Sequence, residues 1–184
     1  MSRVSNIHAI MISKTIQDAI NAQINAEFWS GYLYLSMSNH FEAIGRKGIA
    51  KWFRIQFKEE FDHAQIFINY LNARGGRVLL SPIAEVPTEW NSILAAFADT
   101  LAHERTVTRL INALYALAEE EKDFATRQML NWFVAEQVEE EETAQDIIDN
   151  LELVGEDGTG IYQIDTELGS RSYTQAAPLA NKDK

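Results

Sequence analysis

The chain has 184 residues, of which 46% are hydrophobic, and its formal net charge at pH 7 is −11. This length and hydrophobic content fit one domain with a sizeable core, so most of the chain is not expected to be disordered. The negative charge argues against nucleic acid or an anionic membrane as a partner and is compatible with attracting cations. The absence of cysteine excludes disulfides and thiolate metal ligands.

Residues 1–12 are expected to form a loose N-terminal extension. They lack the layout of a secretory signal, and no apolar stretch of the chain reaches the length of a membrane-spanning helix. We therefore expect a soluble, cytoplasmic protein with no membrane or nucleic-acid partner.

The first half of the chain contains two long segments whose apolar residues recur three and four positions apart, which predicts helices. The first helix is expected from Lys14 to about Glu42, with Ser13 as its N-cap and Gly45 just beyond its C-terminus. The second is expected from about Lys47 to Arg74, where two glycines follow.

Residues 75–90 contain Gly75, Gly76, Pro82 and Pro87, and are expected to form one long irregular crossover. The alternative is a linker between two domains. It is disfavoured because neither side has enough helix to close a core of its own.

The second half repeats the helical pattern twice and then ends in a polar segment. The expected elements are a third helix to about Glu119 capped by Asn91 or Ser92, a fourth from Phe124 to about Leu153 capped by Asp123, a short fifth from Ile161 to about Ser170, and a flexible tail over residues 171–184. Helices of nearly thirty residues are roughly 40 Å long. Two short connections and one long crossover therefore predict an all-α four-helix bundle followed by a short fifth helix.

Each long helix also places polar residues on its inward-facing line, near its middle. They are Glu27 in the first helix, Glu60 and His63 in the second, Glu104 in the third, and Gln137 and Glu140 in the fourth. Helices of similar length that pack side by side bring their midpoints to one level. Carboxylates gathered there would repel one another unless cations bind. The pattern predicts a metal centre, with a protonated or water-filled polar core as the alternative.

Three further glutamates flank this set, namely Glu59, Glu136 and Glu139. Their helical positions point to the edge of the core, where they form an acidic patch together with Glu140. This patch is either an adjacent cation site or a solvated acidic face, which is the usual meaning of a run of like charges. Spacing alone leaves both readings open.

Tyr34 lies two helical turns after Glu27 on the same face of the first helix. It could hydrogen-bond a metal ligand or donate an electron. The alternative is an ordinary amphipathic core residue.

Taken together, Glu27, the Glu60-x-x-His63 motif, Glu104 and the run from Ala135 to Glu141 resemble the bacterial non-haem ferritins. The resemblance covers about residues 13–170 and implies a ferritin-like domain over that range. It also implies a hollow shell of 24 identical subunits that oxidises iron(II) with dioxygen or hydrogen peroxide and stores iron(III) mineral inside.

The resemblance assigns roles to individual residues. Glu27, Glu60 and His63 would hold the first iron of a di-iron centre, and Glu60 would bridge to the second iron. Glu104 would bind the second iron, with Glu140 or Gln137 nearby. A possible third iron would be bound by Glu59, Glu136, Glu139 and Glu140. Tyr34 matches the tyrosine beside the centre, and the expected catalytic residues are Glu27, Tyr34, Glu60, His63 and Glu104.

Two departures from related patterns narrow the family. The fourth helix has no second Glu-x-x-His motif, which disfavours bacterioferritins, ribonucleotide-reductase-like centres and oxygenase-type centres. Phe61 stands where bacterioferritins carry a haem-ligating methionine, so haem is not expected. Three alternatives remain: a DNA-binding mini-ferritin, a structural bundle without catalysis, and a di-manganese or di-iron enzyme that acts on a small molecule.

Overall fold

The computed structural model describes residues 12–180. The predicted extension therefore lies almost entirely outside the described residues, as do positions 181–184 of the predicted tail. Within 12–180 the elements are α1 (Lys14–Ala43), α2 (Lys47–Ala73), α3 (Ile93–Glu120), α4 (Phe124–Val154), α5 (Gly158–Ser170) and α6 (Ala177–Ala180). None of these helices combines the length and the apolar character needed to cross a bilayer.

The predicted all-α fold is confirmed, and the helix ends follow from local chemistry. The Ser13 hydroxyl accepts a hydrogen bond from the Ile16 amide, and the Asp123 carboxylate accepts one from the Thr126 amide, so both residues are N-caps. After α1, Gly45 adopts a φ of 78°, a left-handed conformation that glycine tolerates without strain. Each of these three boundaries was predicted from the residue type.

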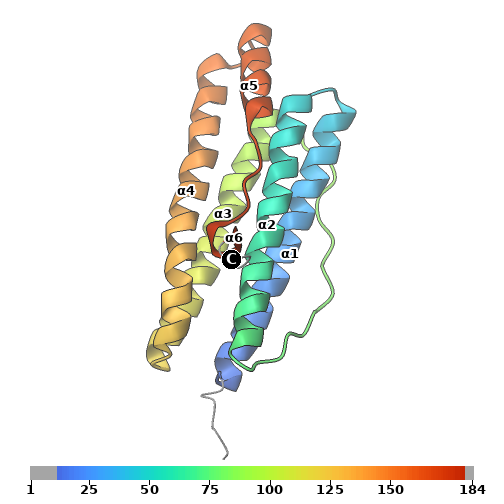
Figure 1. Cartoon of the computed structure of the whole chain (residues 1–184). Coiled ribbons are helices and arrows are strands. Elements are labelled where there is room, and N and C mark those ends of the chain that lie inside the picture. The colour runs from blue at the N-terminus through green and yellow to red at the C-terminus, as the bar shows by residue number, and fades with distance from the viewer. Residues whose placement is uncertain (1–11, 181–184) are drawn as a thin grey trace, which may run out of the picture.

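The four long helices form one bundle in which α1 packs along α2 and α3 packs along α4 (Figure 1). The connection between α2 and α3, residues 74–92, is called the crossover below. It runs along the outer side of α1 and returns the chain to the other end of the bundle (Figure 1). The short α5 packs mainly against α2.

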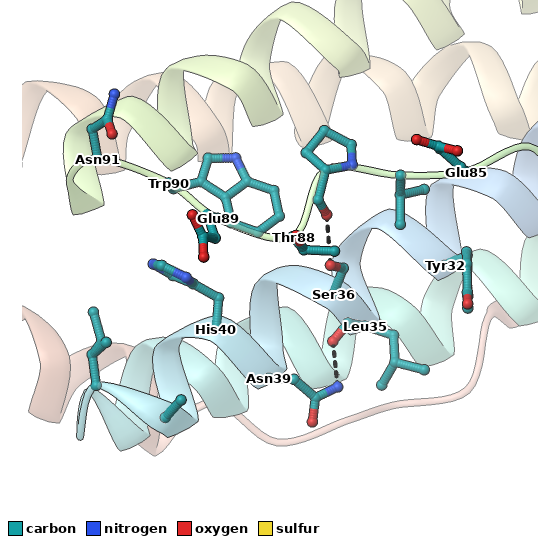
Figure 2. Close-up of a pocket in the computed structure, with 14 residues that line it drawn as sticks. Tyr32, Leu35, Ser36, Asn39, His40, Glu85, Thr88, Glu89, Trp90 and Asn91 are labelled. Atoms are coloured by element: carbon teal, nitrogen blue, oxygen red, sulfur yellow. Dashed lines mark hydrogen bonds between the residues drawn. The ribbon is translucent and has the colours of Figure 1, made fainter.

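Polar side chains of α1 hold the crossover in place. The Asn21 side chain donates to the Arg77 carbonyl at 3.0 Å and accepts from the Leu79 amide at 2.8 Å. Further along α1, the Ser36 hydroxyl donates to the Pro87 carbonyl at 2.6 Å, in the groove that Figure 2 shows between α1 and the end of the crossover. A segment without regular structure thus finds partners for its backbone groups on the helix beside it.

A belt of polar residues divides the apolar core into two clusters. On α2, Phe53 belongs to the first cluster and Phe67 to the second, with Glu60 and His63 between them. The same order holds on the other helices, with Glu27 between Ile24 and Leu33 on α1, Glu104 between Leu101 and Val107 on α3, and Gln137 and Glu140 between Phe133 and Ala144 on α4. Each apolar cluster therefore holds all four helices together on one side of the belt.

The α5 helix docks against the first turn of α2 at a point where two backbones nearly touch. A side-chain carbon added to Gly48 would lie 1.6 Å from the Asp165 carbonyl oxygen, so only glycine fits there. The Asp165 carboxylate accepts a hydrogen bond of 2.9 Å from the Ile49 amide, one of the free amides at the start of α2. This contact fixes the point from which the C-terminal residues depart.

The sequence predicts a flexible tail after α5, whereas residues 171–180 lie along α2 in the structure (Figure 1). The Tyr173 hydroxyl and the Ala176 amide both donate to the Asp62 carboxylate, at 2.8 and 2.9 Å. Leu179 in α6 is 8% exposed and belongs to the second apolar cluster. The sequence prediction missed this docking because the contacts join residues more than a hundred positions apart.

Candidate metal centre

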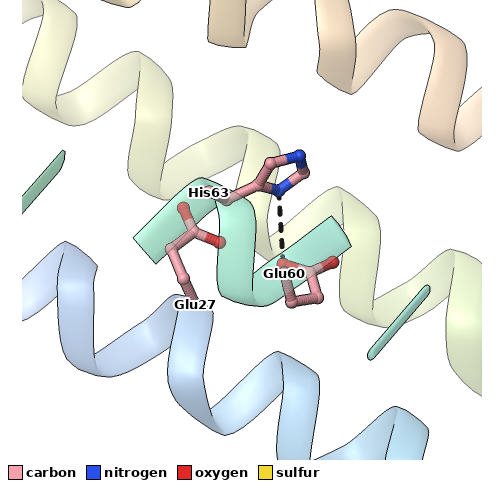
Figure 3. Close-up of side chains that lie close together, drawn as sticks. All are labelled: Glu27, Glu60 and His63. Carbon is pink, nitrogen blue, oxygen red and sulfur yellow. Dashed lines mark ion pairs between the residues drawn. The ribbon is translucent and has the colours of Figure 1, made fainter. Parts of the chain in front are cut away.

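Three potential metal ligands converge in the middle of the bundle. Glu27 comes from α1, and Glu60 and His63 come from successive turns of α2 (Figure 3). One ligand atom from each of the three lies within 4.8 Å of the others, and each residue is at most 2% exposed. The expected shared face of Glu60 and His63 is present, and the facing helix supplies the third ligand.

Two carboxylate oxygens in this group are buried without a hydrogen-bond partner, namely Glu27 Oε2 and Glu60 Oε2. The other Glu27 oxygen accepts a hydrogen bond of 2.8 Å from Gln23. Burying a charged oxygen that has no hydrogen-bond partner is unfavourable by roughly several kcal/mol unless a cation or a proton compensates it. The residues present therefore fit a divalent cation, because hard oxygen ligands and an imidazole suit iron, manganese or zinc.

The imidazole of His63 is held between this group and α4. Its Nδ1 atom lies 3.4 Å from Glu60 Oε2, the contact drawn in Figure 3, and its Nε2 atom lies 4.0 Å from Glu136 Oε1. The ring packs edge-on against Trp132 and Phe133. Its orientation is thus set by aromatic packing and by acidic residues on both sides.

Glu104 is buried beside this group, but hydrogen bonds from neighbours already occupy its carboxylate. The Tyr34 hydroxyl donates to Glu104 Oε1, and the Gln137 amide donates to Glu104 Oε2 at 3.2 Å. Gln137 also donates to the Glu104 backbone carbonyl at 3.3 Å. The Tyr34 hydroxyl thus contacts a belt carboxylate, which is one of the two possibilities that the sequence left open, and the nitrogen of Gln137 points toward Glu104.

Glu140 completes the belt from α4 and is 8% exposed. Its carboxylate accepts a hydrogen bond of 2.9 Å from Gln56 on α2. The sequence interpretation missed both Gln56 and Gln23. Each stands four positions before a belt carboxylate, Gln56 before Glu60 and Gln23 before Glu27, and an amide at that spacing on an inward-facing line was the available signal.

Burial raises the pKa of three belt carboxyl groups, those of Glu27, Glu60 and Glu104, far above that of an ordinary glutamate. The pKa of Glu27 rises to about 8, first because of burial and then because of the nearby Glu60 charge. The pKa of Glu104 also rises to about 8, through burial and the Glu140 charge, and that of Glu60 is raised well above its usual range by burial. Without a metal these groups hold protons at neutral pH, and a bound cation would displace them.

The three flanking glutamates lie in different environments. Glu59 is partly buried and forms an ion pair with Arg171, while Glu136 is partly buried near His63. Glu139 is exposed. Within residues 12–180, the compact group of potential ligands is Glu27, Glu60 and His63, and the flanking glutamates do not join it. The reading of this patch as a third iron site stays a prediction.

His103 is a buried polar residue that the sequence interpretation did not single out. Its Nε2 atom lies 2.8 Å from the Ser30 hydroxyl, and its ring lies against Trp29 and Tyr34. Burial lowers the pKa of the imidazole to about 4, so the ring is neutral at physiological pH. A neutral ring next to Tyr34 adds no positive charge to the carboxylate belt.

Comparison with known proteins agrees with this geometry. Residues 17–154 match the model of the ferritin-like domain. The bacterial non-heme ferritin of Bacteroides fragilis is 47% identical over 161 residues, which is 88% of this chain and 100% of the relative. That of Staphylococcus epidermidis is 38% identical over 165 residues, covering 90% of this chain and 99% of the relative.

Solved structures show the same relationship. The novel open pore ferritin of the hyperthermophilic archaeon Archaeoglobus fulgidus has a TM-score of 0.87 and 48% identity, with 88% of this chain and 99% of that chain covered. A humanized archaeal ferritin has a TM-score of 0.88 and 47% identity, covering 89% of this chain and 99% of that chain. The chain belongs to the ferritin family. The predicted resemblance to bacterial non-haem ferritins and the predicted ferritin-like bundle are confirmed.

Proposed function

We propose that this chain oxidises iron(II) at a di-iron centre within each subunit, using dioxygen or hydrogen peroxide, and stores the product as iron(III) mineral inside a hollow shell of 24 copies. Membership of the ferritin family makes it an iron-storage protein with ferroxidase activity. The proposal adds the site, the oxidant and the number of subunits. It takes residues 13–170 as the ferritin-like domain and the cytoplasm as the location.

Iron(II) is the substrate, and the belt residues bind it. Glu27, Glu60 and His63 would hold the first ion, since they already converge and two of their oxygens lack partners. Glu60 would also reach a second ion, which Glu104 would hold. Glu104 would exchange a hydrogen bond from Tyr34 or Gln137 for a metal bond, with Gln137 or Glu140 nearby.

The electron and proton balance of the reaction follows from the oxidation of two iron(II) ions at one centre. Each iron(II) loses one electron, and the pair reduces one dioxygen to hydrogen peroxide with uptake of two protons. With hydrogen peroxide as the oxidant, the same two electrons and two protons give two water molecules. The raised pKa values of Glu27 and Glu104 mean that iron binding releases protons beside the reacting pair.

The observation that carries this proposal is the presence of two buried carboxylate oxygens without hydrogen-bond partners at the level where four helices place acidic residues. A purely structural bundle would gain stability from apolar residues at these positions, because buried charges without partners are unfavourable. The proposal includes no haem, since Phe61 follows Glu60 and lies against Phe28 and Phe57.

Two other functions predict different assemblies or chemistry. A mini-ferritin would place its irons between subunits and assemble from fewer copies, whereas the ligand group here lies within one chain. Size-exclusion chromatography separates a shell of 24 copies from a dodecamer. A di-iron or di-manganese enzyme that acts on a small organic molecule would turn over without accumulating mineral.

The deciding experiment is stopped-flow absorbance after iron(II) is added to the metal-free shell. Glu60→Ala and His63→Ala should each abolish the fast phase of oxidation, since both remove ligands of the first ion. Glu152→Ala, which removes an exposed carboxylate near the end of α4, serves as the matched control and should oxidise iron at the wild-type rate. An unchanged fast phase in Glu60→Ala would contradict the assignment.

A further inference from the structure

The side chain of Arg171, just after α5, reaches the flanking glutamates beside the metal centre. One of its terminal nitrogens lies 3.0 and 2.8 Å from the two oxygens of Glu59, and the other donates to the Gln56 side-chain oxygen. Its guanidinium lies 5.3 Å from the centre of the Trp52 ring. An ion pair, a hydrogen bond and a ring contact thus hold one charged group in one place.

This contact continues into the belt itself. Gln56 accepts from Arg171 with its oxygen and donates with its nitrogen to Glu140, at 2.9 Å. The guanidinium therefore contacts Glu59 directly and reaches Glu140 through Gln56, which are two of the four residues that the family resemblance assigns to a third iron. Of the other two, Glu136 is partly buried and Glu139 is exposed.

The segment that carries Arg171 is anchored at several further points. Tyr173 and the Ala176 amide bind Asp62, which lies between Glu60 and His63 in α2, and the Lys58 ammonium lies 5.2 Å from the centre of the Tyr173 ring. Leu179 is buried in the second apolar cluster. Figure 1 shows this stretch descending from α5 toward α6 in front of the long helices. The position of Arg171 is thus supported on both sides by docked chain.

We propose that the Arg171 guanidinium takes the place of a metal cation among the flanking glutamates, and that a third metal ion binds there only by displacing it. A guanidinium remains protonated at every physiological pH, so its own positive charge is always present to compete with a metal ion. It lies partly exposed, with 30% of its side-chain surface accessible, so the pair can open. The inference rests on the proposed function, because it concerns an outer ion that would bind beside the two inner ones.

This arrangement would set the order in which ions bind. Two oxygens of the inner group have no hydrogen-bond partner, and among the described residues no arginine or lysine pairs with Glu27 or Glu60, so the first two ions have no such side chain to displace. The third ion must break the contacts of Arg171 with Glu59 and Gln56, and it must also break the hydrogen bond from Gln56 to Glu140. Arg171 is therefore a positioning residue that weakens binding at the outer site while leaving the inner site open.

The test uses metal-free full-length protein titrated with cobalt(II), which binds without being oxidised by the site. Calorimetry gives the dissociation constants, and anomalous diffraction from cobalt-soaked crystals locates each ion. Arg171→Gln should bind the third cobalt about tenfold more tightly than the wild type, because a charge-assisted pair no longer competes. Arg171→Lys should stay closer to the wild type because it keeps the charge.

Lys51→Gln is the matched control. Lys51 donates to the Gly169 carbonyl at 2.8 Å, so this substitution also removes one positive charge from the contact between α2 and the C-terminal residues. It should leave the third dissociation constant unchanged. Asp62→Asn is a second variant that weakens the docked segment without touching the outer ligands, and it should also tighten the third ion.

Three results would overturn the proposal. A third dissociation constant in Arg171→Gln that equals or exceeds the wild-type value, with both inner ions bound normally, would overturn this inference alone. An equal lowering of thermal stability in Arg171→Gln and Lys51→Gln without a change in metal binding would reduce Arg171 to a structural contact. Absence of cobalt at Glu27, Glu60 and His63 in the wild type would overturn the proposed function as well.

Discussion

Replacing Glu27 with glutamine tests whether the belt carboxylates cost stability when no metal is bound. Glutamine has the same shape, can accept the hydrogen bond from Gln23 and carries no charge. The pKa of Glu27 is about 8 in the folded chain against 4.5 for the ordinary group, so between these values the folded state binds more protons than the unfolded state. The stability of the metal-free wild type therefore falls as pH rises through this window.

The size of the effect follows from the same two pKa values. Within this window, each pH unit changes the free energy of unfolding by about 1.4 kcal/mol. The raised pKa of Glu27 therefore lowers the free energy of unfolding by about 1 kcal/mol at about pH 5 and by about 4 kcal/mol at about pH 7.5. Glu27→Gln should therefore stabilise the metal-free chain, and its advantage over the wild type should grow by about 3 kcal/mol between these conditions.

Urea unfolding of the metal-free protein at both pH values measures this difference. Glu152→Gln removes an exposed carboxylate from α4 and should show no such growth with pH. Adding cobalt(II) should reverse the order, because the wild type gains binding free energy that Glu27→Gln, with one ligand fewer, does not. An advantage of Glu27→Gln that is constant or falls as pH rises would refute the reasoning.

Two further substitutions test what holds the bundle and α5 in place. Gly48→Ala should detach α5, because its new side-chain carbon would overlap a backbone oxygen of that helix, and hydrogen exchange of the α5 amides should become faster. Gly158→Ala is the control and should leave this exchange unchanged, because no atom lies within 4 Å of the added carbon. Amides of α5 that stay protected in Gly48→Ala would disprove the account. Arg74→Ala breaks a pair of hydrogen bonds of 2.9 and 3.0 Å to the partly buried Asp123 and should lower the free energy of unfolding by about 2 kcal/mol. Urea unfolding measures this loss. Arg54→Ala removes one hydrogen bond to the Ser38 hydroxyl and should lower the free energy of unfolding far less. Equal losses in the two variants would argue against a special contribution of the Arg74–Asp123 pair.

Much of the fold could be predicted because its determinants are local. The helix ends are set by single residues such as Ser13, Gly45 and Asp123, whose roles depend on a few neighbouring amides. The burial of the belt also follows from sequence. Residues on the inward-facing line of an amphipathic helix are buried whatever their polarity, and Glu27 and Glu104 are each 1% exposed.

What the sequence did not reveal are contacts between distant segments. Docking of residues 171–180 needs the geometry of α5, which depends on the close approach at Gly48. The crossover looks irregular in sequence, yet Asn21 and neighbouring polar residues of α1 bind its backbone. Position on a helix also left open which belt residues converge. Glu104 stands apart from the convergent group because Tyr34 and Gln137 donate hydrogen bonds to its carboxylate. These contacts join different helices and are visible only in the three-dimensional structure.

The division of the core explains how the bundle can contain so unfavourable a belt. Two apolar clusters, one at each side, hold all four helices together, so the fold does not depend on the residues between them. Glu27 and Glu60 can therefore each keep an oxygen without a hydrogen-bond partner, and Glu104 can keep a raised pKa, without the helices separating. Packing on both sides maintains the spacing of the ligands before any ion arrives, and this preorganisation lets a metal ion recover the free energy that burial of the carboxylates costs.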